Sequence, residues 1–226
     1  MGGLILIALN LEAVRNALHT NQVTIVAVTK TQPPEVVRAA FAAGLTVMGE
    51  NRVQEALEKA SQVKDLPLEW HLIGHLQTNK VKQAVSLFSL IHSIDSSRLA
   101  LEINRCAAEI GKIQDVLLQV NVAGEKSKSG IAPEQANELA KLIESLLHIR
   151  LCGVMTIAPF YDNPEHARPV FRQTRSIFDT LRRGASSPEC FRWLSMGMTH
   201  DYGVAVEEGS NMIRIGTGLF GARTAP

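Results

Sequence analysis

Residues 24–30 read Thr-Ile-Val-Ala-Val-Thr-Lys, a β-branched apolar run that ends in a lysine. Such a run predicts a buried strand, and a lysine at its end packs its stem against an apolar wall while its amine reaches the rim of the sheet. Removal from water disfavours the ammonium form, so the amine of Lys30 is suited to attack a carbonyl carbon. A lysine at a strand end is also typical of an ordinary surface residue, so the rest of the chain has to decide between the two interpretations.

Runs of the same kind recur to the end of the chain and predict eight strands, at residues 24–30, 46–51, 70–74, 90–94, 115–121, 151–157, 193–198 and 212–216. The runs are short and almost continuously apolar, which is typical of parallel strands that are covered on both faces. Helical patterns separate them, at residues 34–43, 52–63, 78–87, 97–110, 133–147, 164–183 and 199–208, and another helix is predicted to run through Leu18 before the first strand.

Strict alternation of strands and helices favours an α/β fold, a single (β/α)8 TIM barrel over residues 1–226 with an extra N-terminal helix. An open, doubly wound sheet is the alternative, although such sheets usually contain fewer strands. The longest irregular segments, residues 122–132 and 158–163, each follow a strand. In a barrel they lie at the C-terminal face of the strands, where active sites are found.

Composition narrows the class of protein. Apolar residues make up 46% of the chain and charged residues 20%, and the net charge of +1 gives no electrostatic footprint for nucleic acid. The three cysteines, Cys106, Cys152 and Cys190, fit neither a disulfide framework nor a metal-binding spacing, which favours a reducing compartment. The apolar residues 3–8 are too few to span a membrane and follow no basic residue, so we expect a cytoplasmic protein with no membrane partner.

Residues 212–221, Met-Ile-Arg-Ile-Gly-Thr-Gly-Leu-Phe-Gly, contain a G-x-G-x-x-G spacing directly after the last predicted strand. A dinucleotide-binding fingerprint would open a βαβ unit, and too few residues follow Gly221 for one. The backbone amides of Gly216 and Thr217 instead predict a phosphate seat of the kind that barrels carry at this position. Arg214 faces the same side of the strand as Gly216. It is either a salt-bridged barrel residue or an arginine aimed at an aromatic nitrogen of the same ligand.

Three further motifs have weaker interpretations. Thr199 follows the seventh predicted strand, where its hydroxyl is placed to cap the next helix and to meet the phosphate. His71 and His75 have the spacing of a zinc-binding pair, but they lie in a predicted strand, whereas that spacing shares a face only on a helix, so no metal site is expected. Residues 124–130 lack the Gly-Lys-Ser/Thr ending of a nucleotide-binding loop, which favours a mobile loop.

The ordered motifs closely resemble those of the pyridoxal phosphate homeostasis proteins, relatives of the alanine racemase N-terminal barrel. They are Ala27-Val-Thr-Lys30, Gly49-Glu-Asn-Arg-Val-Gln-Glu55, His71-Leu-Ile-Gly-His-Leu-Gln-Thr-Asn-Lys80, Leu118-Gln-Val-Asn121, Gly153-Val-Met-Thr156, Leu194-Ser-Met-Gly-Met-Thr199 and Arg214-Ile-Gly-Thr217.

The resemblance implies a barrel that carries pyridoxal 5'-phosphate covalently, as a Schiff base on Lys30, with Arg214 facing the pyridine nitrogen. The resemblance also implies that the phosphate is held by Gly216, Thr217 and Thr199. It implies that Ser195 and Asn51 line the wall of the pocket. Thr29 and Thr199 stand where serine is common in the family, a change that keeps the hydroxyl.

The resemblance also implies intracellular pyridoxal phosphate homeostasis, in which the protein buffers the cofactor or delivers it to apo-forms of pyridoxal phosphate enzymes. A related racemase needs a second base, a tyrosine from a separate β-domain, and this chain ends shortly after the barrel, so we expect a monomeric carrier without efficient amino-acid turnover. An arginine opposite the pyridine nitrogen also keeps that nitrogen unprotonated, which makes the ring a poorer electron sink.

Two enzyme interpretations stay open beside the carrier. A weak racemase or lyase of the same fold would use Tyr161 or Tyr202 as its second base, since both follow predicted strand ends. A Schiff-base aldolase that needs no cofactor fits Lys30 and the phosphate seat, but it gives Arg214 nothing to bind.

Overall fold

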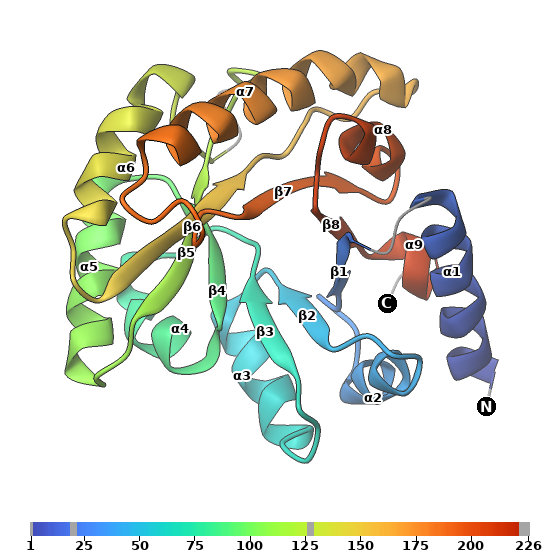
Figure 1. Cartoon of the computed structure of the whole chain (residues 1–226). Helices are drawn as coiled ribbons and strands as arrows, with labels where there is room; N and C mark the ends of the chain where they lie inside the picture. The colour runs from blue at the N-terminus through green and yellow to red at the C-terminus, as the bar shows by residue number, and fades with distance from the viewer. Residues whose placement is uncertain (1, 19–21, 126–128, 222–226) are drawn as a thin grey trace.

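The computed structural model describes residues 2–18, 22–125 and 129–221. Eight parallel strands pair in sequence order, and the last pairs back to the first, so that the sheet closes into a barrel (Figure 1). This confirms the predicted barrel and excludes the open sheet. The strands are β1 Thr24–Val28, β2 Val47–Glu50, β3 Glu69–Leu72, β4 Leu90–Ile94, β5 Gln114–Gln119, β6 Ile149–Met155, β7 Trp193–Met198 and β8 Met212–Ile215.

Helices form the outer layer (Figure 1). They are α1 Gly2–Leu18, α2 Pro34–Ala42, α3 Val53–Gln62, α4 Val81–Leu87, α5 Ser97–Glu109, α6 Ala136–Glu144, α7 Arg168–Gly184, α8 Tyr202–Glu207 and α9 Thr217–Phe220. Short 3-10 turns precede three of them, η1 Thr78–Lys80, η2 Pro133–Gln135 and η3 Pro164–Ala167. The extra N-terminal helix α1 packs beside α2 and α9, near both ends of the chain.

The strands have apolar residues on both faces because each face packs against a separate core. A large cluster fills the space between strands and helices and includes Met48, Ile91 and Val116. A smaller cluster fills the barrel interior and consists of Val26, Ile73, Leu90, Leu117, Cys152, Met155 and Met212. Successive strand residues point to opposite faces, so a strand covered on both sides shows no polar alternation.

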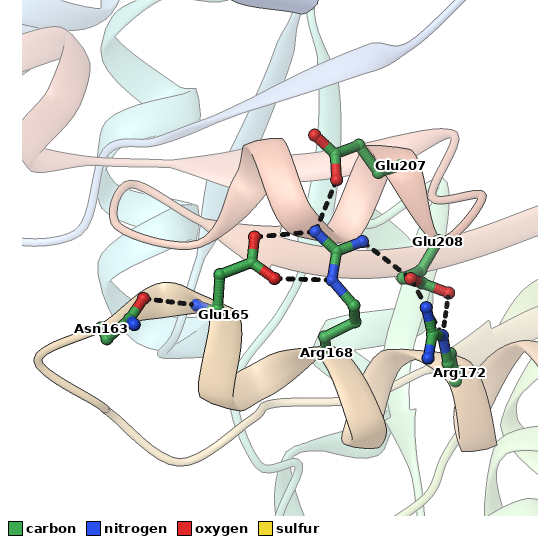
Figure 2. A network of polar contacts seen from close by, with 6 residues as sticks. All are labelled: Asn163, Glu165, Arg168, Arg172, Glu207 and Glu208. Carbon is green, nitrogen blue, oxygen red and sulfur yellow. Dashed lines mark hydrogen bonds and ion pairs between the residues drawn. The ribbon is translucent and has the colours of Figure 1, made fainter.

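An ion-pair network fastens the segment after β6 to helix α8 (Figure 2). Asn163 accepts a hydrogen bond from the amide of Glu165 at 3.0 Å and begins the turn η3. Arg168 then binds Glu165 at 2.7 Å, Glu207 at 2.6 Å and Glu208 at 2.8 Å. One exposed pair contributes little, but a shared arginine loses its side-chain entropy only once for all of its partners. The network therefore holds the turn η3 and the start of α7 against the C-terminal end of α8.

Three further expectations from the sequence concern a membrane span, the cysteines and the loop after β5. Among the described residues no helix is both long and apolar enough to cross a bilayer. No disulfide links the three cysteines, and burial raises the pKa of the Cys152 thiol to about 12. The loop predicted at residues 124–130 includes residues 126–128, which lie outside the described residues.

Candidate functional site

Lys30 lies at the C-terminal end of the barrel, two residues beyond the last residue of β1. Val26 belongs to the interior cluster and Val28 packs against it, and Lys30 continues their series of alternate positions. The amide of Thr29 donates to the carbonyl of Gly49 at 3.1 Å, which extends the pairing of β1 with β2 beyond the strand itself. Continued by two residues, the same register would place Lys30 opposite Asn51.

A buried lysine on α3 fixes the backbone of Thr29, the residue that precedes Lys30. The ammonium of Lys59 donates to the carbonyl of Thr29 at 2.5 Å, to Glu50 at 2.7 Å and to Glu55 at 2.7 Å. The hydroxyl of Thr29 donates to the same Glu50 oxygen at 2.6 Å. The Lys59 side chain is only 7% exposed, and burial raises the pKa of the Glu50 carboxyl.

The backbone of Thr31, the residue that follows Lys30, is held by the same group of side chains. Thr31 has a φ of 63°, a left-handed conformation that residues other than glycine rarely adopt. Its amide donates to Glu55 at 2.5 Å, and Glu55 is in turn bound to Lys59. Hydrogen bonds on both sides of Lys30 thus set the direction in which its side chain leaves the chain.

We expect Lys59→Met to destabilise the fold strongly, since it leaves the buried Glu50 carboxylate without its cation. Removing one partner of a buried ion pair costs about 3–5 kcal/mol. Lys112→Met is the matched control, because the ammonium of Lys112 is also partly buried but donates to the carbonyls of Val85 and Phe88, at 2.8 Å each. Urea unfolding should show a clearly smaller loss for Lys112→Met. Equal losses would contradict the role of the carboxylates.

Arg214 lies in the barrel interior on β8, next to β1. Its side chain donates from Nη1 to the hydroxyl of Ser195 at 2.6 Å and from Nη2 to the carbonyl of Thr156 at 2.8 Å. Burial lowers the pKa of the guanidinium to about 10. Both acceptors are neutral, so within the described residues these contacts do not form the salt bridge that the sequence left open for Arg214. The structure brings the predicted residues Arg214 and Ser195 into direct contact.

Two buried histidines extend the series of polar contacts that begins with Arg214 and Ser195. His92 Nδ1 lies 3.1 Å from the Ser195 hydroxyl, and His92 Nε2 lies 3.2 Å from His71 Nδ1. Burial lowers the pKa of both imidazoles, most strongly that of His92. His75 is instead more than half exposed and lies 3.7 Å from Asp95, so it does not share a site with His71. Within the described ranges, no three His, Cys, Asp or Glu side chains gather as a metal site.

Thr199 connects the ends of β7 and β8. Its hydroxyl accepts a hydrogen bond from the amide of Gly218 at 3.2 Å, at the start of α9. The expectation that Thr199 caps the helix after β7 is therefore wrong. Asp201 accepts from the amide of Met198 at 2.6 Å and closes a turn, so that α8 begins only at Tyr202.

The Gly216–Gly218 turn is tightly enclosed. A Cβ at Gly218 would approach the γ-methyl groups of Ile215 and Thr199 to 3.0 Å each. Gly216 precedes the first residue of α9 and lies against Val28 of β1, where an added Cβ would be 3.5 Å from the Val28 Cβ. The predicted phosphate residues are therefore adjacent to the strand that leads to Lys30.

Asn51 lies at the edge of this arrangement. It lines a cavity of about 440 Å³ together with Arg52, His75 and Lys80, at the C-terminal ends of β2 and β3. Its backbone is packed so closely that a Cβ at Gly74 would lie 2.4 Å from the Asn51 carbonyl oxygen. Asn51 thus borders the region beside Lys30, but in the described part of the chain no hydrogen bond or ion pair joins its side chain to Arg214 or to the Gly216 turn.

Sequence reasoning missed three contributors. His92 is inside a predicted strand, and its place in the alternation with Leu90 could have indicated an interior polar residue. Lys59 is a charged residue in an amphipathic helix, a pattern that normally indicates a solvent-exposed side chain. Thr156 acts through its carbonyl, which no sequence motif encodes.

Comparison with known proteins agrees with this geometry. Residues 4–224 match the family described as "Alanine racemase, N-terminal domain". The chain is 50% identical over 196 residues to the pyridoxal phosphate homeostasis protein of Aquifex aeolicus (strain VF5), which covers 86% of this chain and 84% of the relative.

Two solved structures of PipY from Synechococcus elongatus PCC7942 are similar over the whole barrel, one without PLP with a TM-score of 0.89 and one with PLP bound with a TM-score of 0.87. Both are 39% identical to this protein, and the match covers 95% of this chain and 100% of PipY. The resemblance that the motifs indicated is confirmed: the chain belongs to the pyridoxal phosphate homeostasis proteins, a family built on the alanine racemase N-terminal domain.

Proposed function

We propose that this protein binds pyridoxal 5'-phosphate through Lys30 and acts in intracellular homeostasis of that cofactor, holding and delivering it without efficient amino-acid turnover. The observation that carries the proposal is the placement of Arg214. Its buried guanidinium contacts neutral acceptors, lies two residues before the Gly216 turn, and belongs to the strand next to β1.

The residues match the chemistry of the ligand at three points. Arg214 can only donate hydrogen bonds, so it suits an unprotonated ring nitrogen. The amides of Gly216 and Thr217, at the start of α9, suit a phosphate group. The amine of Lys30 would hold the ligand covalently through its aldehyde carbon, with loss of water. Thr199 holds the phosphate turn in place through Gly218, while Ser195 holds Arg214.

When bound, pyridoxal phosphate supplies an electron-accepting ring. An arginine partner leaves its nitrogen unprotonated and weakens that property. Tyr161 and Tyr202, the tyrosines considered as a second base, both pack against the core between strands and helices rather than against the interior cluster. This arrangement supports a carrier over a racemase. The aldolase alternative leaves Arg214 without a ligand to bind.

The same proposal extends to the setting of the protein. As a carrier, it would act in the cytoplasm as a monomer and release the cofactor to apo-forms of pyridoxal phosphate enzymes. The names of its relatives and the PLP-bound structure of PipY support the ligand. Size-exclusion chromatography coupled to light scattering tests the monomer, and recovery of activity by an apo-enzyme mixed with the loaded protein tests delivery.

Replacing Thr217 by leucine tests the phosphate seat. Leucine keeps the Thr217 amide but removes the hydroxyl beside it and adds bulk at the seat. A hydrogen bond to a charged group is worth about 1.5–3 kcal/mol, so the dissociation constant for pyridoxal phosphate is expected to rise roughly 10- to 100-fold. That for pyridoxal, which has no phosphate, should change little. Thr180→Leu, an exposed change on α7, is the control and should alter neither. Absorbance titration measures both ligands, and equal losses for the two would place the phosphate elsewhere.

A further inference from the structure

We propose that Glu69, His71, His92 and Ser195 form a one-directional hydrogen-bond relay through the barrel, which positions Arg214 and links it to the opposite rim. The inference rests on the proposed function in one respect, that Arg214 faces the ring nitrogen of the bound ligand. The four residues are called the relay below.

The relay runs through the interior from one end of the barrel to the other. Its members lie on β3, β4 and β7, on the same face of each strand as the residues that fill the interior. Arg214 lies on that face of β8, two residues after Met212. Arg214 binds Ser195 at 2.6 Å, Ser195 lies 3.1 Å from His92, and the histidine rings are joined at 3.2 Å.

The last link leads to solvent. His71 Nε2 lies 3.9 Å from a Glu69 carboxylate oxygen, an ion-pair distance that one water can bridge. Glu69 is the first residue of β3, and its side chain is 66% exposed. The N-terminal ends of parallel strands lie opposite the end that carries Lys30, so the relay connects the site with the far rim.

The chemistry of the two ends sets the direction of every hydrogen bond. An arginine can only donate, so the Ser195 oxygen accepts from it and keeps one hydrogen and one lone pair for other partners. The Glu69 end decides between them: with both histidine protons on Nε2, the Ser195 hydrogen is directed to His92 Nδ1. His92 then carries its proton on Nε2 and donates to His71 Nδ1. His71 likewise carries its proton on Nε2, directed at Glu69, which as a carboxylate can only accept.

The reverse direction is disfavoured at the rim. It would place the lone pair of His71 Nε2 against the Glu69 carboxylate, where two acceptors face each other. A proton added to the histidine pair would also break the order, because both nitrogens of one ring would then donate. Burial lowers the pKa of both rings, and the positive charge of Arg214 lowers that of His92 further, while Glu69 opposes the shift at His71.

Arg214 is a buried cation, and both groups that accept its hydrogen bonds are neutral. The relay stabilises this cation through its aligned dipoles. Dipoles that all point the same way polarise one another, and each presents its negative end toward the guanidinium. Glu69 adds a negative charge at the outer end of the series, with Arg192 as the charged neighbour that offsets part of it. The buried carboxylate of Asp201 also acts on Arg214 through its charge, while Ser195, with His92 and His71 behind it, positions the guanidinium through hydrogen bonds.

The first test is the position of the protons on the histidine rings, read by two-bond ¹H–¹⁵N NMR of the ligand-free protein. We expect the Nε2–H form for both His71 and His92. His148 is the internal contrast, because its Nδ1 lies 3.3 Å from the carbonyl of Lys112 and has to carry a proton to donate to it. An Nδ1–H form of either relay histidine would overturn the proposal.

The second test asks whether the far rim is coupled to the interior. Glu69→Gln removes the outer charge from an exposed side chain and is expected to shift the ¹⁵N resonances of both relay histidines. Asp115→Asn, which breaks an ion pair with Arg150 elsewhere on the same rim, should leave them unchanged. Unchanged resonances in Glu69→Gln, or equal shifts in both variants, would overturn the coupling.

The third test concerns the ring nitrogen. His92→Phe is expected to weaken binding of pyridoxal phosphate about tenfold, the cost of a buried polar group that loses its partner. Binding of the 1-deaza analogue, whose ring has a C–H in place of the nitrogen, should change little. Equal losses for the two ligands would reduce His92 to a packing role. If the wild-type protein bound neither ligand, the proposed function would fail while the NMR result still decided the relay.

Discussion

Borohydride reduction of the protein loaded with pyridoxal phosphate is expected to fix the phosphopyridoxyl group on Lys30, and Lys30→Ala is expected to lose the absorbance band of the covalently bound ligand. Lys30 is the lysine that follows β1, next to the strand that carries Arg214 and the phosphate turn. The hydrogen bonds of Thr29 and Thr31 direct its side chain. Peptide mass mapping measures the first outcome and absorbance spectroscopy the second.

The fold should survive this change, because Lys30 lies at the rim of the barrel and is half-buried rather than part of either core. Circular dichroism and urea unfolding of Lys30→Ala should match the wild type closely. Lys80→Ala is the matched control, since Lys80 lines the neighbouring cavity and should keep both the band and the mapped site. A phosphopyridoxyl group mapped to Lys80, Lys126 or Lys128 would refute the assignment.

Alanine incubated with the loaded protein is expected to show at most a trace of racemisation. Removal of the α-proton on one face of the cofactor requires a group on the other face to return it. A positioned acid or base is typically worth about 10²–10⁴-fold in rate. Lys30 supplies one such group, whereas the side chains of Tyr161 and Tyr202 pack between strands and helices. Deuterium exchange at the α-carbon, followed by chiral analysis, measures the outcome.

Sustained turnover at rates typical of enzymes, roughly 1–10³ per second, would contradict the carrier function. Tyr161→Phe and Tyr202→Phe would then identify the second base, since removal of the hydroxyl from the correct tyrosine should abolish the exchange. If the protein is a carrier, both variants should show the same trace of deuterium exchange as the wild type. Transfer of the cofactor to an apo-enzyme should then proceed in the absence of racemisation.

Local pattern was sufficient for the architecture. The apolar runs predicted every strand to within two residues at each end, because a strand that is covered on both faces needs apolar residues at successive positions. The prediction was poorer where a helix begins after a turn: helix α8 starts at Tyr202 rather than Thr199, because the carboxylate of Asp201 binds the Met198 amide first. A side-chain contact of that kind competes with the helix, and helical periodicity does not reveal it.

The site was predicted in part. Lys30 and the Gly216 turn follow strand ends and Arg214 lies near the C-terminal end of β8, and a barrel brings these ends to one face, so their grouping follows from the fold class. Thr199 was predicted as a phosphate contact but with the wrong backbone partner, since its hydroxyl reaches the amide of Gly218 across to the next strand.

The sequence by itself determined the eight-stranded barrel, the lysine at the end of β1 and the glycine turn after β8, because each depends on the spacing of residues along one segment. Only the tertiary structure decided what surrounds the buried cations. Lys59 is placed between two carboxylates, and Arg214 is placed against Ser195 on the neighbouring strand, with His92, 103 residues before Ser195, behind it. Packing of α3 on the ends of β1 and β2 creates the contacts of Lys59 with Thr29 and Glu50, and closure of the barrel brings His92 to Ser195 and Arg214. A buried charge is stable only with such partners.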